Sequence, residues 1–297
     1  MTDKPQTMDA IYGLPAPAKL NLFLHVIGRR EDKKHLLESV FVLIDRSDLI
    51  DLERLNTDTI ERVGDVIGDP EHDLCVRAAR LLKETYSIPC GVRIRVTKRI
   101  PSGAGMGGGS SDAATTLIGL NRLFGLGLDR ATLMTLGLQL GADVPFFLYG
   151  RSAFVEGIGE RMSSVDVPSM QVAVVWPGKS VSTAEIFSSP ALTRDTLSTK
   201  IRIFADAVTS HWPTLYGHND LQPVAIEKEP AIARALEWLS PFTEPRMTGS
   251  GSAVFGILSK RDYNLDSLFS DLPETWIGFV AESLSEHPLA QWLDEKN

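Results

Sequence analysis

The chain has 297 residues, and this length slightly favours two domains over one. Hydrophobic residues make up 43% and charged residues 23%, which is typical of a folded globular protein and excludes intrinsic disorder. Lys and Arg total 30 and Asp and Glu total 38, giving a formal net charge of -8. This charge excludes most proteins that bind nucleic acid through a basic face, although a few donors placed together can still bind the phosphates of a small molecule.

The two cysteines, Cys75 and Cys90, are too few for a disulfide framework, and the sequence has no C-x-x-C pair for zinc. It shows neither a secretion signal nor a run of about 20 apolar residues, the length that a membrane-spanning helix needs. We therefore expect a cytoplasmic enzyme that acts on small molecules and binds neither nucleic acid nor a membrane.

Strands and a helix alternate in the first third of the chain. Residues 19–26 have the period of two that is typical of a strand, with leucine and valine on one face. Residues 37–52 also predict strand structure, interrupted by a polar turn. Leucine and alanine recur with helical spacing over residues 73–86, and residues 92–97 alternate again as a strand.

The rest of the chain mixes helices and strands without a period, so no repeat array is expected. Proline, serine and threonine are dense over residues 180–198, which predicts a connection. We place a domain boundary near residue 165, giving domains 1–165 and 166–297. Helices are expected from residue 110 to about 125, over 130–140 and over 231–239, and strands over 154–160, 171–175, 253–258 and 277–280.

The strongest signal is a glycine-rich loop over residues 101–111, between a predicted strand and a predicted helix. Five glycines fall between positions 103 and 109, where the backbone can take positive φ and present its N–H groups to a ligand. The start of the helix adds free N–H groups and the positive end of a dipole, which stabilise a nearby anion by roughly 0.3–1 kcal/mol. Ser110 and Ser111 are expected to cap that helix or to bind a phosphate. A flexible Gly-Ser linker is the alternative.

Three other motifs fit the sequence poorly. Gly103-x-Gly105-x-x-Gly108 matches the dinucleotide fingerprint, but a second helix follows where that motif needs a strand carrying an acid. A Walker loop needs a glycine where Ala173 stands, and a hydrolase elbow needs one where Ala113 stands. A nicotinamide- or flavin-binding oxidoreductase therefore stays open as a different class, beside a nucleotide-binding module without activity.

The loop instead resembles the phosphate loop of the superfamily that contains galactokinase, homoserine kinase, mevalonate kinase and phosphomevalonate kinase. Together with it, residues 16–24, 141–147 and 246–255 are similar to the 4-diphosphocytidyl-2-C-methyl-D-erythritol kinase family. Homoserine and mevalonate kinases are the nearest rivals, but residues 21–25 and the Asp-Val-Pro-Phe-Phe run favour the first family.

The resemblance implies an α+β fold of two domains, a ribosomal-protein-S5-like N-terminal domain and a ferredoxin-like C-terminal domain, with ATP and an acceptor in the cleft between them. It also implies transfer of the γ-phosphate of ATP to the 2-hydroxyl of 4-diphosphocytidyl-2-C-methyl-D-erythritol, in the non-mevalonate route to isoprenoid precursors. The catalytic pair of the family falls on Lys19 and Asp143. From spacing alone, a solvated strand end for Lys19 and an ordinary helix cap for Asp143 are the alternatives.

By the same resemblance the glycine loop holds ATP, and Lys98 lies beside the adenine; a surface lysine is the alternative. A second Gly-Ser turn, residues 246–252, is expected to face the site. Mg2+ is expected with ATP, and no protein ligand is assigned to it. The expected ATP-binding residues are Lys98, Pro101, Ser102, Gly103, Ala104, Gly105, Met106, Gly107, Gly108, Gly109, Ser110 and Ser111.

The acceptor is expected to bind Asn21, His35 and Phe187. In the family pattern Asp-Gly-Tyr-His the tyrosine stacks on the cytosine and the histidine reads its edge, but here Lys34 stands before His35. A cation–π contact from lysine is worth about 0.5–2 kcal/mol, so we hypothesise weaker cytosine binding. Asp73 stands where relatives carry asparagine, which leaves the nucleoside contacts there open.

Overall fold

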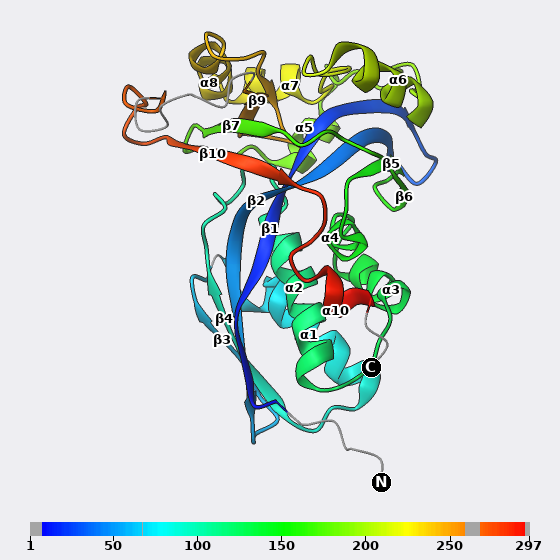
Figure 1. The fold of residues 1–297 in the computed structure, drawn as a ribbon, viewed down its shortest axis with the longest axis vertical. Coiled ribbons are helices and arrows are strands. Elements are labelled where there is room, and N and C mark those ends of the chain that lie inside the picture. Colours follow the sequence, from blue (N-terminus) through cyan, green and yellow to red (C-terminus); the bar gives the residue numbers. More distant parts are fainter. Residues whose placement is uncertain (1–7, 67, 259–267, 295–297) are drawn as a thin grey trace.

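Two long antiparallel strands, β1 (Ala10–Arg29) and β2 (His35–Leu55), form the backbone of the molecule. In the computed structural model, which describes residues 8–66, 68–258 and 268–294, they run from the lower end into the upper layer (Figure 1). Residues 16–26 of β1 are buried on both faces, polar positions included. The middle of β1 is therefore an interior strand that brings polar side chains into the protein.

The other edge of β2 pairs with three strands in turn. Residues 37–41 pair with β5 (Ala153–Gly157), Ile44 and its neighbour with β10 (Ile277–Leu284), and residues 49–55 with β4 (Gly91–Thr97). One strand thus joins the lower and upper parts of a connected sheet of ten strands. The remaining strands are β3 (Ile60–Gly64) beside β4, β6 (Arg161–Ser164) beside β5, and β7 (Gln171–Trp176), β9 (Val254–Ile257) and β8 (Arg246–Met247) beyond β10.

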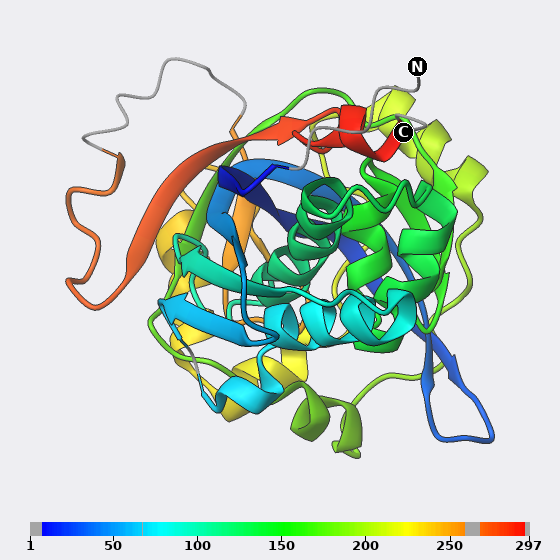
Figure 2. The same cartoon turned by 90° about the horizontal axis from the view of Figure 1, so that it is seen from below.

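Helices cover one face of the lower sheet, as the view from below shows (Figure 2). Their apolar sides share a core with the strands that includes Leu52, Leu117 and Phe146. Leu289 and Leu293 join the same core, so the end of the chain returns to the lower layer. The elements are η1 (Pro70–His72), α1 (Leu74–Tyr86), α2 (Gly108–Leu123), α3 (Arg130–Leu140), α4 (Val144–Tyr149) and the C-terminal α10 (Ala290–Asp294).

A second group of helices lies in the upper part of the molecule, with β7, β9 and β10. Their core includes Val175, Ile232 and Met247, and a central cluster combines Met106 from the glycine loop with Phe255 from β9. None of the described helices is long and apolar enough to cross a membrane. The helices are α5 (Thr183–Ser188), α6 (Ile201–His211), α7 (Gln222–Lys228) and α8 (Ala231–Leu239).

The structure confirms most of the predicted elements, including helices 130–140 and 231–239, and corrects three expectations. The polar turn predicted within residues 37–52 is wrong: β2 is continuous, because Asp48 is buried and accepts backbone hydrogen bonds from Arg99 and Ile100. The connection over residues 180–198 contains the short helix α5. The helix after the glycine loop begins at Gly108, two residues earlier than expected.

Asp73 caps the helix that borders the glycine loop. Its Oδ1 accepts from the backbone N–H groups of Cys75 and Val76, and its Oδ2 forms an ion pair with Arg62 at 2.8 Å. Asparagine would keep the cap and lose the charge. The carboxylate of Asp73 therefore both caps α1 and pairs with Arg62.

We predict that Asp73→Ala lowers the free energy of unfolding by at least about 1 kcal/mol, the typical value of a lost N-cap, plus the ion pair with Arg62. Asp73→Asn, the matched control, loses less because an amide oxygen still caps the helix. Chemical denaturation of both variants measures this. Equal stability of Asp73→Ala and the parent chain would contradict the role of the cap.

Candidate active site

The glycine loop connects the end of β4 to α2 and packs against a second loop. Gly103, Gly105 and Gly107 all have positive φ, between 67° and 76°, and Gly107 is the N-cap residue of α2. A Cβ on Gly105 would lie 2.4 Å from the carbonyl oxygen of Thr248, too close for any other residue. A Cβ on Gly107 would lie 3.1 Å from Cγ of Lys19. The glycines are thus required for close packing as well as for backbone conformation.

The second loop, residues 248–252, is held from two sides. The backbone N–H of Ala253 donates to the carbonyl of Ala104 at 3.1 Å, which links the two loops directly. The side chain of Asn219 donates to the carbonyls of Met247 and Gly249, each at 2.8 Å. The expectation that this turn faces the first loop agrees with these contacts. Sequence reasoning missed Asn219, whose partners lie about 30 residues further along the chain.

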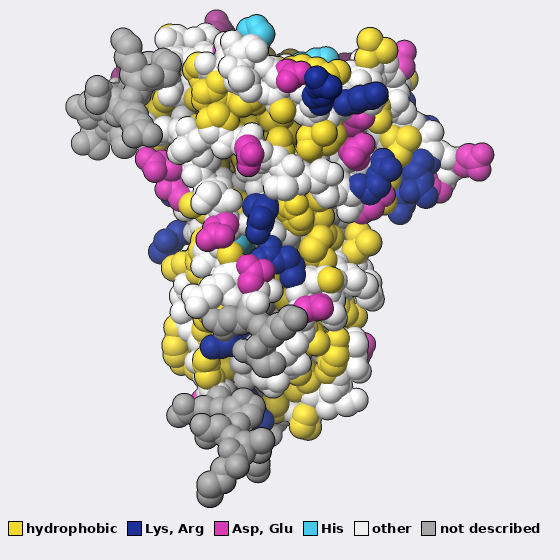
Figure 3. All heavy atoms as spheres, turned by 45° about the vertical axis from the view of Figure 1, so that its right-hand side comes forward, with side chains coloured by type: hydrophobic (Ala, Val, Ile, Leu, Met, Phe, Trp, Pro, Cys, Tyr) yellow, Lys and Arg dark blue, Asp and Glu magenta, His cyan; other side chains and the backbone are white. Residues whose placement is uncertain are grey.

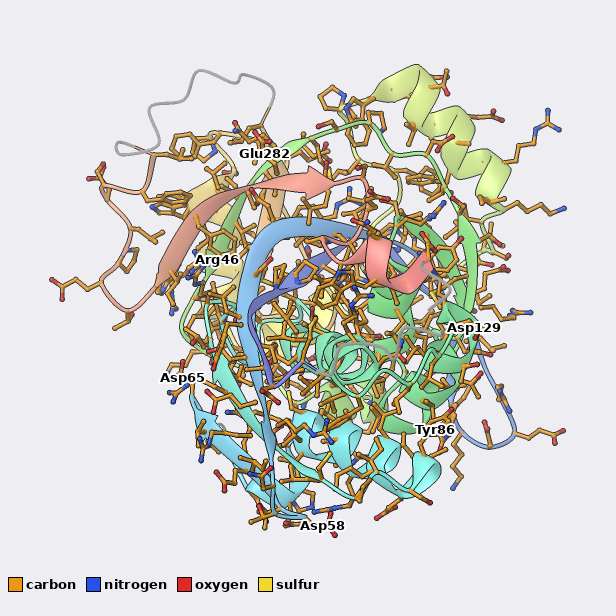
Figure 4. The ribbon with its side chains drawn as sticks, turned by 60° about the horizontal axis from the view of Figure 1, so that its bottom comes forward. Arg46, Asp58, Asp65, Tyr86, Asp129 and Glu282 are labelled. Atoms are coloured by element: carbon orange, nitrogen blue, oxygen red, sulfur yellow. The ribbon has the colours of Figure 1, made fainter. Side chains whose placement is uncertain are left out.

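A pocket of about 410 Å³ lies along the glycine loop. Its walls combine the start of α1, the residue that follows β3, Asp65 (labelled in Figure 4), and the second loop at Ser250 and Gly251. Ser110 lines the pocket, whereas Ser111 is fully buried inside α2 and its hydroxyl has no partner among the described residues. Neither serine caps the helix, because Gly107 holds that position. Of the expected ATP-binding residues, the pocket is lined by Lys98, Pro101, Ser102, Gly103, Ala104, Gly105, Met106, Gly107, Gly108, Gly109 and Ser110.

Lys19 and Asp143 face each other next to this loop. The backbone N–H of Lys19 donates to the carbonyl of Met106 at 3.0 Å, and its Nζ lies 3.8 Å from Oδ2 of Asp143. The ammonium donates to Oδ1 of Asn21 at 2.5 Å and lies 4.5 Å from the centre of the Phe41 ring. Burial lowers the pKa of Lys19, and the charge of Asp143 opposes that shift. Lys19 is only 3% exposed, so the alternative of a solvated strand end is wrong.

Asp143 holds the N-cap position of α4, but its side chain makes no capping hydrogen bond. The carboxylate is 37% exposed and faces Lys19 instead. Asn21, also buried, donates from its side chain to Oγ of Ser39 at 3.0 Å, and its backbone N–H donates to Oγ1 of Thr248. This arrangement places a buried ammonium beside an accessible carboxylate.

Lys98 lies between two carboxylates and is not a surface residue, so that alternative is also wrong. Its Nζ lies 2.7 Å from Oδ2 of Asp112 and is hydrogen-bonded to Asp48. Burial lowers the pKa of Lys98, but the two carboxylates more than offset this and raise it. Burial raises the pKa of Asp112 to about 7; Lys98 opposes the shift and Asp48 adds to it. Oδ1 of Asp112 has no hydrogen-bond partner among the described residues.

His35, at the start of β2, and Phe187, in α5, contact each other although they are far apart in the sequence. Their rings stack with centroids 4.8 Å apart and planes at 27°. Lys34, the residue in place of the family's tyrosine, is exposed in the turn between β1 and β2. Near Phe187, Oγ1 of Thr183 lies 2.7 Å from Oγ of Ser250, which links α5 to the second loop.

Charged side chains of both signs are interspersed on the face that Figure 3 shows. The positive groups available to an anion near the glycine loop are its backbone N–H groups and Lys19, because Asp48 and Asp112 already bind the ammonium of Lys98. Among the described residues, no group of three His, Cys, Asp or Glu side chains is placed to hold a metal ion.

Relatives of this chain identify its family. Residues 73–151 match the family model of the GHMP kinases N terminal domain, and residues 192–277 match that of the GHMP kinases C terminal. A 4-diphosphocytidyl-2-C-methyl-D-erythritol kinase of Polynucleobacter necessarius is 50% identical over 281 residues, which cover 93% of each chain. The chain belongs to this kinase family.

Solved structures agree with the family and with the predicted fold. A crystal structure of 4-(cytidine 5'-diphospho)-2C-methyl-D-erythritol kinase is 32% identical, with a TM-score of 0.78, and covers 91% of this chain and 98% of that one. Homoserine kinase from Cytophaga hutchinsonii is 14% identical, with a TM-score of 0.64 over 97% and 98% of the chains, and shares the fold alone. The predicted two-domain GHMP-kinase fold is confirmed, whereas the boundary near residue 165 stays a prediction.

We predict that Asp112 makes stability depend on pH. The folded chain holds a proton on Asp112 up to about pH 7, and the unfolded chain releases it near 3.8. Between these values the folded state binds more protons, so the free energy of unfolding falls as pH rises. Asp112→Asn cannot titrate at this position. The fall in its free energy of unfolding between about pH 5 and about pH 8, measured by denaturation, should therefore be smaller than in the parent chain by at least about 1 kcal/mol.

Asp206→Asn, an exposed position on α6, is the matched control and should leave the slope unchanged. A slope in Asp112→Asn equal to that of the parent chain would contradict the assignment. The other groups that face Asp112 are Lys98, Asp48 and the thiol of Cys75, none of which these substitutions remove.

Proposed function

We propose that the chain transfers the γ-phosphoryl group of ATP to the 2-hydroxyl of 4-diphosphocytidyl-2-C-methyl-D-erythritol. The observation that carries this proposal is the Lys19–Asp143 pair beside a glycine loop, in a chain that is 50% identical to kinases named for this acceptor. The 410 Å³ pocket along the loop is the proposed ATP site, and the stacked rings of His35 and Phe187 are the proposed acceptor site.

Phosphoryl transfer depends mainly on positioning and on charge stabilisation. In the proposed reaction Asp143 accepts a hydrogen bond from the acceptor hydroxyl and takes its proton as the new O–P bond forms. A carboxylate is too weak a base to remove an alcohol proton early, but it can accept the proton late in the step. As the new O–P bond forms, the bond between the γ-phosphorus and the bridging oxygen of ATP breaks, and ADP leaves with the electron pair. The ammonium of Lys19 stabilises the negative charge on the oxygens of the transferred group.

The glycine loop is proposed to bind the phosphates through its backbone N–H groups and the start of α2. Lys98 contributes little free positive charge, because Asp48 and Asp112 already bind its ammonium. Magnesium would enter with the nucleotide and neutralise part of the charge of its phosphates. The protein's own positive groups near the phosphates are backbone N–H groups and Lys19.

The acceptor is proposed to place its cytosine beside His35 and Phe187 and its erythritol hydroxyls near Asn21. Asn21 lies 2.5 Å from Nζ of Lys19, which connects acceptor binding to the reacting group. Lys34 does not take part in the ring stack between His35 and Phe187, so one aromatic surface is absent from the base site.

An assay of ADP release tests the proposed substrate. We predict turnover with 4-diphosphocytidyl-2-C-methyl-D-erythritol, and at least about 100-fold lower kcat/KM with mevalonate and homoserine, because neither fills a base site. The three acceptors are compared at equal concentration with saturating ATP. Equal or greater turnover of mevalonate or homoserine would overturn the proposed function.

We predict that Lys34→Tyr lowers KM for the cytidine acceptor several-fold, by about the 0.5–1.5 kcal/mol that an added aromatic pair contributes. The value of kcat should hardly change, because residue 34 does not touch the reacting atoms. Lys34→Ala is the matched control, since it removes the lysine without supplying a ring. If Lys34→Tyr changes nothing and the parent KM is as low as in tyrosine-bearing relatives, the hypothesis of weakened cytosine binding is wrong.

A further inference from the structure

A single guanidinium ties the two rings of the proposed base site together. Arg194 donates from Nε to Nε2 of His35 at 3.1 Å and from Nη2 to the carbonyl of Phe187 at 3.1 Å. The same group donates to the carbonyls of Ser189 at 2.7 Å and Leu192 at 2.9 Å. Arg194 thus joins the start of β2 to the end of α5, where backbone carbonyls lack helical partners.

The contact with Arg194 fixes which nitrogen of His35 carries a proton. A guanidinium has only donors, so Nε2 of His35 must offer its lone pair. A neutral imidazole with a free pair on Nε2 carries its hydrogen on Nδ1. None of the described residues hydrogen-bonds this Nδ1, so its N–H is available to a ligand.

The surrounding charges keep His35 neutral. Burial lowers the pKa of His35, and the positive charges of Arg194 and Arg29 lower it further. Protonation at Nε2 would also place one N–H against another. His35 therefore offers one fixed donor and no second proton at neutral pH.

We infer that Arg194 is a positioning residue for pyrimidine recognition, which holds His35 as a hydrogen-bond donor and so favours cytosine over uracil. Cytosine has an acceptor at its ring N3, whereas uracil carries a hydrogen there. A donor that faces N3 makes a hydrogen bond with the first base and leaves two opposed N–H groups with the second. The inference rests on the proposed function, which places His35 and Phe187 at the base.

Nuclear magnetic resonance of the imidazole nitrogens tests the first half of the inference on the unaltered protein. With 15N-labelled histidine, and His35→Gln to assign the signals, we expect the proton of His35 on Nδ1 in the parent chain. In Arg194→Met both tautomers of His35 should be populated. A proton on Nε2 in the parent chain would overturn the inference.

Binding of CDP and UDP tests the second half. Calorimetric titrations are made with a saturating non-hydrolysable ATP analogue, so that the probes report on the acceptor site. The parent chain should bind CDP at least about tenfold more tightly than UDP, the effect of one hydrogen bond replaced by opposed donors. Arg194→Met should bring the ratio close to one, and Arg194→Lys, which keeps one donor, should restore part of it.

Arg202→Met is the matched control, because Arg202 is 89% exposed on α6 and lies outside the site. It should keep the preference of the parent chain. If Arg194→Met does not fold, the ratio of CDP to UDP affinity in the parent chain and in Arg194→Lys still tests the inference. Equal binding of CDP and UDP by the parent chain, or an unchanged preference in a folded Arg194→Met, would overturn the inference.

The two proposals fail on different results. Absence of ADP release with the cytidine acceptor overturns the proposed function. A proton on Nε2 of His35, or equal binding of CDP and UDP in a chain that does phosphorylate the cytidine acceptor, overturns the role of Arg194 alone. In steady-state kinetics Arg194→Met should raise KM for the acceptor with little change in kcat, since Arg194 does not touch the reacting atoms.

Discussion

The close contact between two glycine loops is the constraint on which the site depends. A Cβ on Gly105 would meet the carbonyl of Thr248 at 2.4 Å, and one on Gly249 would meet the carbonyl of Gly105 at 2.6 Å. Only glycine on both sides allows this approach. Because one loop leads into α2 and the other joins β8 to β9, their contact brings residues from distant parts of the chain to the walls of one pocket.

For the proposed anionic substrates the positive groups near these loops are local: backbone N–H groups of the glycine loop and the ammonium of Lys19. Lys19 is buried with Asn21 and Asp143 as its polar neighbours, and Lys98 is held by two carboxylates. Arg246, also buried, donates to the carbonyls of Leu22 and Tyr216 and so fixes the second loop to β1. The net charge of -8 is a property of the whole chain and does not describe the glycine loop.

Local patterns predicted the parts of the fold that depend on local energetics. The glycine loop is predictable because its spacing is unusual, helix 231–239 because its apolar spacing is regular, and the end of helix 130–140 because Gly141 follows it. The partners of Lys98 were not predicted, since residues 48 and 112 come together only through the pairing of β2 with β4 and the packing of α2. Arg194 was missed for the same reason: its contact with His35 spans 159 positions in the chain. Helices α6 and α7 and strand β3 also escaped prediction, although Ile201, Phe204 and Val208 of α6 recur with helical spacing and pack against the central cluster.

The role of Asp143 is the central claim of this account, and pre-steady-state kinetics of Asp143→Asn test it most directly. Asparagine keeps the size of the side chain but cannot take a proton. The rate of the chemical step should fall at least about 100-fold, while the dissociation constants of ATP and the cytidine acceptor should change little. Asp166→Asn serves as a control outside the site. A chemical step in Asp143→Asn as fast as in the parent chain would contradict the account.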